Sequence, residues 1–395
     1  MSTLKVDAIR HNSATSDAIT TAADGTCTAK LTSVGGGGLS HRNKVINGAM
    51  TVSQYNGTSV VTGVNATGYR IDRWTHQIAS INSAFSVSQS TDSPDGFANS
   101  YKIDVTTADT SLAAAHAHFF RQKIEGQNLQ DFAKGSSSAK QFALSFYVKT
   151  TKTGVYTVEL YDVDNNRAIS KIFTVADTNW NRYTIIFPAD TTGAFGNDNG
   201  NSLVLQFWLS AGSNYTTGTF NNSAWGSVSG KARVSSSNVN FGDSTSNDWY
   251  ITGVQLEVGD TATTFEHRTY QEEILRCMRY YQQITGDDRG YNGATGSTGS
   301  FKNSVIGIYN GVTDVRAVYY HMVPMRDEPT LTVLGAMSDF DLEPHDRAPS
   351  SISMNRASPY QSTLIIADSG SATKGDACLV TIDNAAGGLA FSAEL

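Results

Sequence analysis

Aromatic residues set among amide and hydroxyl side chains are the groups in this sequence best suited to bind a ligand. The stretch 213–223 contains Tyr215 and Phe220 among asparagines, threonines and serines, and Trp225 follows it closely. The C–H face of a sugar stacks on a flat ring while neighbouring polar groups bind its hydroxyls. We therefore expect glycan contacts at Tyr215, Phe220, Trp225 and Trp180.

His116 and His118 are the residues most suited to hold a metal. They are two positions apart, so on a strand both side chains lie on the same face. Zinc or nickel could use this spacing, but no third ligand stands nearby in the sequence. We expect an ordinary pair of surface or interface histidines and no bound metal. The alternative is a metal held on a three-fold axis by one histidine from each of three chains.

Clustered carboxylates are the groups with catalytic potential. They are Asp162 and Asp164, and further along Asp339, Asp341, Glu343 and Asp346. Glycoside hydrolysis needs two carboxyls about 5 to 9.5 Å apart across a cleft, one of them with a raised pKa. The segment 162–166 is more typical of a turn, or at most of a weak calcium loop. Neither a Gly-x-Ser-x-Gly motif nor the repeat of roughly 20 residues of a β-solenoid is present, so we expect no catalysis.

The composition favours an extracellular type of surface with few charges. Asp, Glu, Lys and Arg make up 16% of the 395 residues, against a typical share of about 25%. The formal net charge of −7 and a pI near 5.6 argue against a nucleic-acid partner. No apolar run approaches the roughly 20 residues needed to span a bilayer, and the start of the chain lacks a secretory signal. The cysteines, Cys27, Cys277 and Cys378, are too scattered for a disulfide framework or a zinc site, and no cofactor is expected.

Changes in period and composition divide the chain into five segments. The N-terminal segment 1–33 has short strand-like stretches that cannot bury a core alone, so it needs copies of itself or another protein. A run of glycines makes 34–44 a hinge. Alternating apolar residues predict strands through 45–265, and helical spacing follows over 266–284. Prolines concentrate in 285–395, which indicates a separate β domain with well-defined turns.

The expected fold is mainly β: an antiparallel jelly-roll sandwich plus a smaller C-terminal β domain, joined by a short helix, with an extended N-terminal segment. Apolar residues alternate in strand-like runs, such as Phe142, Leu144, Phe146 and Val148, then Tyr183, Ile185 and Phe187, then Leu203, Leu205 and Phe207. Strand-like stretches place Trp74, Trp208 and Trp249 in the core. The strands expected in the C-terminal domain are 305–309, 315–322, 330–334, 363–366, 379–382 and 389–393.

The predicted helix has an apolar stripe at Ile274, Met278 and Tyr281, which are spaced i, i+4 and i+7. Glu272 can pair with Arg276 one turn later. We expect this stripe to pack at the domain junction and across a trimer.

Several motifs recur in one kind of protein. They are N-x-x-I-N-G-x-M-x-V-x-Q at 43–54, G-Y-x-x-D-R-W at 68–74, V-Q-L-E-x-G at 254–259, the helix from Phe265 to Tyr281 that ends R-Y-Y, and the opening residues 2–12. Together they resemble bacteriophage tail fibres and receptor-binding proteins of the marine or cyanophage type, which have a carbohydrate-binding-like jelly-roll module.

This resemblance implies a virion protein, assembled in the host cytoplasm and exposed to the medium after lysis. It implies a homotrimer attached to other phage tail proteins through 1–33, which adheres to host surface polysaccharide or lipopolysaccharide. Weak contacts multiplied over several copies would give avidity. A purely structural virion protein, such as a head decoration, fibre adaptor or baseplate component, is the alternative. A polysaccharide depolymerase is the third candidate.

Overall fold

The computed structural model describes residues 6–10, 12–13, 18–29, 40–286, 304–343, 345–384 and 386–395. The run of glycines predicted to be a hinge lies outside the described residues. Near the N-terminus, β1 (Ala8–Ile9), β2 (Ile19–Thr21) and β3 (Cys27–Ala29) form a small antiparallel sheet. Its described side chains are mostly exposed, as expected of strands too short to bury a core.

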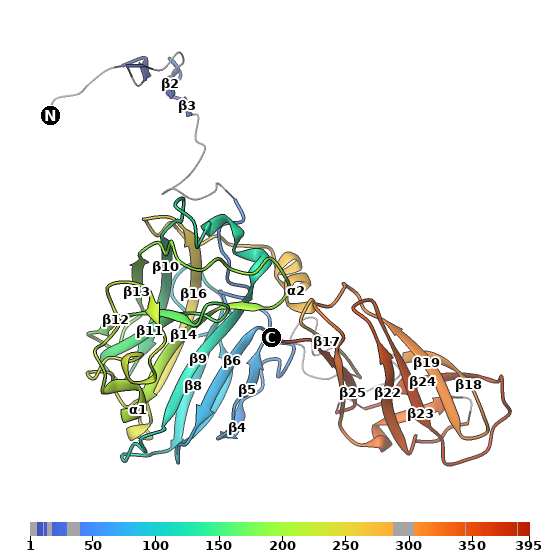
Figure 1. The fold of residues 1–395 in the computed structure, drawn as a ribbon. Helices are drawn as coiled ribbons and strands as arrows, with labels where there is room; N and C mark the ends of the chain where they lie inside the picture. Colours follow the sequence, from blue (N-terminus) through green and yellow to red (C-terminus); the bar gives the residue numbers. More distant parts are fainter. Residues whose placement is uncertain are drawn as a thin grey trace.

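Two antiparallel sheets form a sandwich from the middle of the chain (Figure 1). The first sheet has six strands in the order β13-β10-β16-β8-β7-β4. They are β4 (Val61–Val64), β7 (Ala84–Ser90), β8 (Ser100–Thr107), β10 (Phe142–Thr150), β13 (Asn181–Phe187) and β16 (Asp248–Val258).

The second sheet of the sandwich has seven strands in the order β15-β12-β11-β14-β9-β6-β5. They are β5 (Gly68–Ile71), β6 (Trp74–Ala79), β9 (Ala117–Glu125), β11 (Gly154–Asp162), β12 (Arg167–Val175), β14 (Asn201–Ala211) and β15 (Gly226–Ser227). The expectation of a mainly β, antiparallel sandwich is confirmed.

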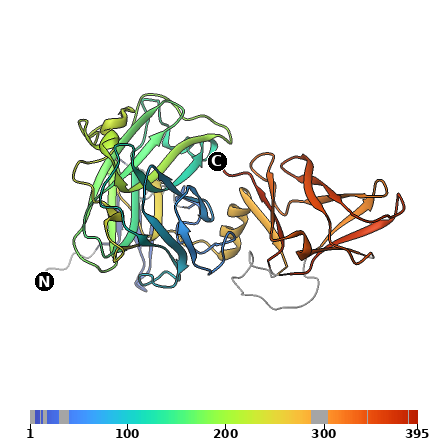
Figure 2. The same cartoon turned by 90° about the horizontal axis from the view of Figure 1, so that it is seen from below.

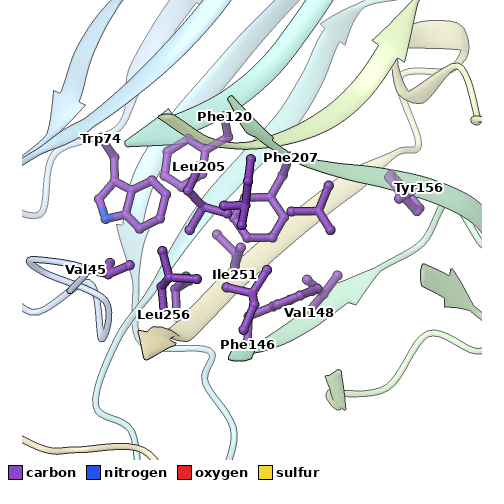
Figure 3. Packing of buried hydrophobic residues seen from close by; sticks show 14 of the residues in the cluster. Val45, Trp74, Phe120, Phe146, Val148, Tyr156, Leu205, Phe207, Ile251 and Leu256 are labelled. Atoms are coloured by element: carbon purple, nitrogen blue, oxygen red, sulfur yellow. The ribbon is translucent and has the colours of Figure 1, made fainter. Parts of the chain in front are cut away.

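The core between the sheets is built from alternate positions of the strands. Phe146 and Val148 of β10 are fully buried because successive side chains of a strand point to opposite faces (Figure 3). Opposite them, the ring of Trp74 stacks on Phe120 with centroids 4.6 Å apart. Trp74 and Trp249 are fully buried, which confirms their predicted place in the core. Each such side chain contributes roughly 1.5–3 kcal/mol by its removal from water.

Helical turns occupy the loops of the sandwich. They are η1 (Gly126–Asn128), η2 (Gln130–Phe132), α1 (Ser213–Thr216), η3 (Gly230–Ala232) and η4 (Phe241–Asp243). Among the described residues, no helix has the length and apolar character needed to cross a membrane.

The junction helix α2 (Tyr270–Met278) is shorter than the predicted 266–284. Thr269 begins it through a capping box, in which its hydroxyl accepts from the Glu272 N–H and the Glu272 carboxylate accepts from the Thr269 N–H. Tyr281 is not part of the helix, because the chain turns there into strand β17 (Tyr281–Thr285).

The apolar stripe of α2 is used inside the chain rather than across a trimer. Ile274 and Met278 are buried with Val52 of the sandwich, and Val323 of the C-terminal region packs against the same cluster. Tyr281 is also buried, with its ring 3.9 Å from that of Tyr55. These side chains therefore pack between the sandwich and the C-terminal region. Their predicted contact across a trimer is wrong, because no exposed apolar stripe remains at these positions.

The C-terminal region contains two more antiparallel sheets around their own core. The small one has the order β17-β25-β20, with β20 (Thr330–Leu334) and β25 (Gly388–Ser392). The larger one has the order β21-β24-β18-β19-β23-β22 and follows the turn η5 (Met337–Asp339). Its strands are β18 (Ser304–Tyr309), β19 (Asp314–Tyr320), β21 (Phe340–Glu343), β22 (Ser351–Ala357), β23 (Gln361–Ala367) and β24 (Ala377–Ile382).

The predicted strands of the C-terminal domain all overlap strands of the structure, but β17, β21 and β22 were not predicted. The region also begins earlier than 285, since β17 pairs with β25 from Tyr281 onward.

The helix α2 lies between the sandwich and the C-terminal region (Figure 2). A buried polar cluster joins the two parts of the chain there. Arg73 stands in the tight turn between β5 and β6 with a φ of 70°. It forms an ion pair with Glu394, and its guanidinium lies 3.3 Å from the ring centre of Tyr280. Next to it, the carboxylate of Asp72 accepts from the Gln54 N–H at 2.6 Å, and burial raises the pKa of Asp72 to about 7. Four of these five residues belong to the recurring motifs, so three of the motifs contribute side chains to this junction.

Candidate functional site

Polar residues cross the outer face of the seven-stranded sheet in one row. The strand register places Ser170 opposite Glu159, Glu159 opposite Gln206, Gln206 opposite Arg121, and Arg121 opposite Thr75. Residues directly opposite in an antiparallel sheet lie on the same face. At about 4.8 Å per strand, the row is about 19 Å long. The core residues come from the alternate positions of the same strands, so this row faces away from the core.

Glu159 lies at the centre of this row and is completely buried. Its carboxylate accepts hydrogen bonds from the Gln206 amide, from Trp208 Nε1 at 3.0 Å, and from Arg233 Nε and Nη2 at 2.8 and 3.0 Å. Burial opposes the charged form of Arg233, but the Glu159 carboxylate outweighs it and raises the pKa of Arg233. Because Arg233 follows η3, this ion pair holds the loop between β14 and β16 against the sheet.

A hollow of about 330 Å³ opens between this loop and strands β11 and β12. Its wall combines the ring of Phe220, the amide of Asn221, the hydroxyls of Ser170 and Ser227, and the guanidinium of Arg233. A volume of about 300 Å³ or more, with an apolar surface and a few placed polar groups, is typical of a site for a small organic ligand. The wall offers both a ring for stacking and donors and acceptors for hydroxyl groups.

The structure brings two of the four predicted glycan-contact residues to this face. Phe220 lines the hollow and is half-buried. Tyr215 lies nearby in α1, with its ring centre 5.1 Å from that of Trp208. Trp208 is buried as predicted, but under the loop on the outer face rather than between the sheets.

The other two predicted glycan contacts lie elsewhere. Trp180 precedes β13 of the opposite sheet, where its Nε1 donates to Asp92 at 2.9 Å and its ring meets Tyr250 edge to face. The prediction for Trp225 is wrong, because its ring is only 7% exposed and packs in the core 5.4 Å from Phe142. Its Nε1 donates to the Pro188 carbonyl, so the indole is already satisfied.

The histidines predicted to lie on a surface or an interface are in fact buried. His118 lies inside the sandwich with its Nε2 next to Nε2 of His76 on the neighbouring strand β6. His116 Nε2 lies 2.9 Å from the hydroxyl of Ser210. Burial lowers the pKa of His76 to about 3 and that of His116 to about 4, so both are neutral at physiological pH. A metal held on a three-fold axis by one of these histidines from each of three chains is excluded, because the rings are buried within the chain.

The carboxylate clusters stand apart from the hollow. Asp162 is buried and forms an ion pair with Lys134, and it accepts from the Asn165 N–H at 3.1 Å, which is turn chemistry as predicted. Asp341, Glu343 and Asp346 offer oxygens within 4.8 Å of one another near β21. Burial and the neighbouring Asp346 raise the pKa of Asp341. Among the described residues that line the hollow, Glu159 is the one carboxylate, so the hollow itself lacks the pair needed for hydrolysis.

The residues that organise this face were not identified from the sequence. Glu159 stands at an outward position between the inward apolar residues Val158 and Leu160, a signal that alternation could have supplied. The signal is weaker around Arg121, because the polar residues His118 and Gln122 share the inward face of β9 with apolar ones. Arg233 is in an irregular loop, and its partner is 74 positions away. No local pattern connects the two.

No protein-family model matches this chain, and no curated protein matches it in sequence. Some solved structures do resemble it. One is described as "CBM4 structure and function", with 11% identity over 54% of this chain and 97% of that one, and a TM-score of 0.26. Another is a putative sugar-binding protein from Bacteroides thetaiotaomicron, with 11% identity over 55% of this chain and 100% of that one. Its TM-score is 0.29.

A third similar structure is a family 11 carbohydrate-binding module from Clostridium thermocellum in complex with a mixed-linked tetrasaccharide. It has 11% identity, covers 53% of this chain and 98% of its own, and has a TM-score of 0.25. TM-scores below 0.5 carry no weight for what this chain binds, which depends on its own side chains.

Proposed function

We propose that this protein is an adhesin that binds polysaccharide on the outer face of its seven-stranded sheet, without cleaving it. The observation that carries the proposal is the hollow beside Phe220, where a half-buried ring stands among amide and hydroxyl groups. A sugar ring presents an apolar face and a rim of hydroxyls, and this wall is complementary to both. The loop is fixed by the Glu159–Arg233 ion pair, so little ordering is needed on binding.

The absence of catalysis is part of the same proposal. The hollow's only described carboxylate, Glu159, is buried and already accepts from several donors, so it is poorly placed to transfer a proton to a glycosidic oxygen. A depolymerase would require a second carboxyl group near the first.

The biological setting we propose is a bacteriophage tail fibre that attaches to host surface polysaccharide or lipopolysaccharide. The support is the set of recurring motifs in the sequence. In this proposal residues 1–33 attach the chain to other tail proteins, and the protein reaches the medium after host lysis. The alternative is a structural virion protein, and the buried junction, to which three of the motifs contribute, would serve either role equally well.

A homotrimer is part of this proposal and is supported by an apolar surface on the larger C-terminal sheet. We call it the C-terminal apolar face; it comprises Ile306 and Ile308 of β18, Val318 and Tyr320 of β19, and Met322 beyond them. Ile306 is 73% exposed and Tyr320 71% exposed. Adjacent exposed apolar side chains of this kind mark protein contact surfaces. Copies of this chain are the proposed occupants. The mass in solution of an Ile306→Asp, Tyr320→Asp variant should fall to that of a monomer.

The glycan site is tested by comparing two aromatic substitutions in the full chain. Phe220→Ala should weaken binding to polysaccharide from susceptible hosts by about tenfold or more, on the scale of one lost aromatic contact. Trp180→Ala removes a comparable ring from the opposite sheet and should leave binding unchanged. The reverse outcome would place the site on the six-stranded sheet. If the folded protein binds no host glycan at all, the structural role is favoured.

A further inference from the structure

Arg121 stands on the outer face without an acidic partner. Its Nη2 donates to the side-chain oxygen of Gln77 at 2.8 Å, and its guanidinium lies 5.4 Å from the ring centre of Phe119. Its Nε is buried and has no hydrogen-bond partner among the described residues. None of the ion pairs in the described parts of the chain involves Arg121. The side chain is only half-exposed, so water does not fully replace the missing carboxylate.

Other cations surround Arg121. Lys123 is two residues along the same strand and donates from Nζ to the main-chain oxygen of Leu395, and the charge of Arg233 in the loop acts on Arg121. Burial lowers the pKa of Arg121; the neighbouring Tyr69 acts in the opposite direction, and the charge of Arg233 again lowers it. Burial, followed by the charge of Arg121, lowers the pKa of Lys123 to about 8. These cations therefore repel one another in a partly dehydrated setting.

The acidic groups near this surface are already used. Glu159 is bound through both oxygens by Arg233, and Glu394 forms an ion pair with Arg73. The charge of Arg121 therefore has no acidic partner on this face among the described residues, although the whole chain has a net charge of −7. A local excess of positive charge on an acidic protein favours anionic ligands at that place and repels them elsewhere.

We propose that the outer face selects acidic polysaccharides, with a carboxylate or sulfate group of the glycan bound by Arg121. This inference rests on the proposed function, because it names the class of glycan bound at the same face. Arg121 is one strand from Gln206 and two from Glu159 in the polar row. It is therefore about 10 Å from the residue that anchors the hollow. Gln206 and Glu159 lie beneath the loop, so the row itself is covered, but a polysaccharide bound in the hollow beside Phe220 is long enough to bring an acidic substituent across this short distance to the guanidinium. A guanidinium binds such groups through paired hydrogen bonds.

The test measures the affinity of the full chain for three polymers: polygalacturonate with carboxylates, a carrageenan with sulfates, and neutral dextran. We expect one or both acidic polymers to bind more tightly than dextran. Their affinity should fall as NaCl is raised from about 0.05 to about 0.5 M. Arg121→Gln should lower the affinity for the acidic polymer about 10- to 100-fold, which is the effect of losing a hydrogen bond to a charged group. The polymer that responds identifies carboxylate or sulfate as the group bound.

Two further variants serve as controls for this test. Arg121→Lys retains the charge without the planar fork, so it should recover part of the affinity and all of the salt dependence, which a folding defect would not do. Arg356→Gln makes the same charge change at an exposed position of β22 and should alter nothing.

Two outcomes would overturn the inference in different ways. Equal, salt-independent binding of dextran and the acidic polymers, with no effect of Arg121→Gln, would refute acidic selectivity while leaving polysaccharide binding intact. No binding of these polymers or of host polysaccharide by the folded chain would refute the proposed function, and this inference with it.

Discussion

Replacing Glu159 with Gln is expected to destabilise the outer-face loop and the sandwich beneath it. The carboxylate of Glu159 accepts from Gln206, from Trp208 Nε1 and twice from Arg233. An amide of the same size keeps one oxygen acceptor but turns the other oxygen into a donor that faces the donors of Trp208 or Arg233. The charge of Arg233 then remains partly buried without its counter-ion.

The magnitude follows from the burial of the two partners. Removing one member of a buried ion pair costs about 3–5 kcal/mol, because the other charge is left uncompensated. Glu159 is completely buried, but the Arg233 side chain is 19% exposed and regains some hydration. We therefore expect a loss of about 3 kcal/mol in the free energy of unfolding of the sandwich.

Urea unfolding of the full chain, followed by tryptophan fluorescence, measures this loss, since Trp208 bonds directly to the carboxylate. The matched control is the double variant Glu159→Leu, Arg233→Met. It removes both charges and should cost less than Glu159→Gln alone. A loss below about 1 kcal/mol for Glu159→Gln, or a larger loss for the double variant, would show that the pair does not fix the loop.

Three other predictions concern the buried framework. Burial lowers the pKa values of His76, to about 3, and of His118, so both stay neutral in the folded state. The stability associated with them is complete above the unfolded pKa near 6.5 and falls below it by about 1.4 kcal/mol per pH unit for each. Urea midpoints across this range should vary less with pH in a His76→Gln, His118→Gln double variant. Glu394→Gln leaves Arg73 buried without its carboxylate and should cost about 3–5 kcal/mol by calorimetry, whereas an Arg73→Met, Glu394→Leu pair should cost less. Gly48→Ala places a methyl group against a backbone oxygen of β16. The melting temperature of this variant should fall, because its free energy of unfolding drops by about 1–3 kcal/mol.

The sandwich could be predicted because the alternation of apolar and polar residues in its strands can be recognised within a short stretch of sequence. Phe146 and Val148 alternate with polar residues, and the structure buries them as expected. The helix start has a local signal too, since Thr269 and Glu272 form a capping box, although the predicted start at 266 is too early. The helix end could not be found in this way, because Tyr281 pairs with β25 more than 100 positions later, and this pairing overrides the helical spacing.

The candidate site could be predicted only in part. Phe220 was found because a ring among polar residues in a loop has a local signature. Trp225 has the same signature but is buried in the core, since burial depends on how the loop folds back. The role of Arg121 depends on the absence of a carboxylate across neighbouring strands, and the role of Arg233 on a partner far away in sequence. Both depend on the register of the sheet, which single-sequence patterns do not provide.

The most direct test of the central claim is to map where a polysaccharide touches the protein. Hydrogen–deuterium exchange of the full chain would be compared with and without a host-derived polysaccharide that it binds. We predict slower exchange in the loop around Phe220, in β12 and in β9, with no change beside Trp180 or on the C-terminal apolar face. Protection confined to the six-stranded sheet or to the C-terminal region, with none around Phe220, would contradict the assignment of the binding face.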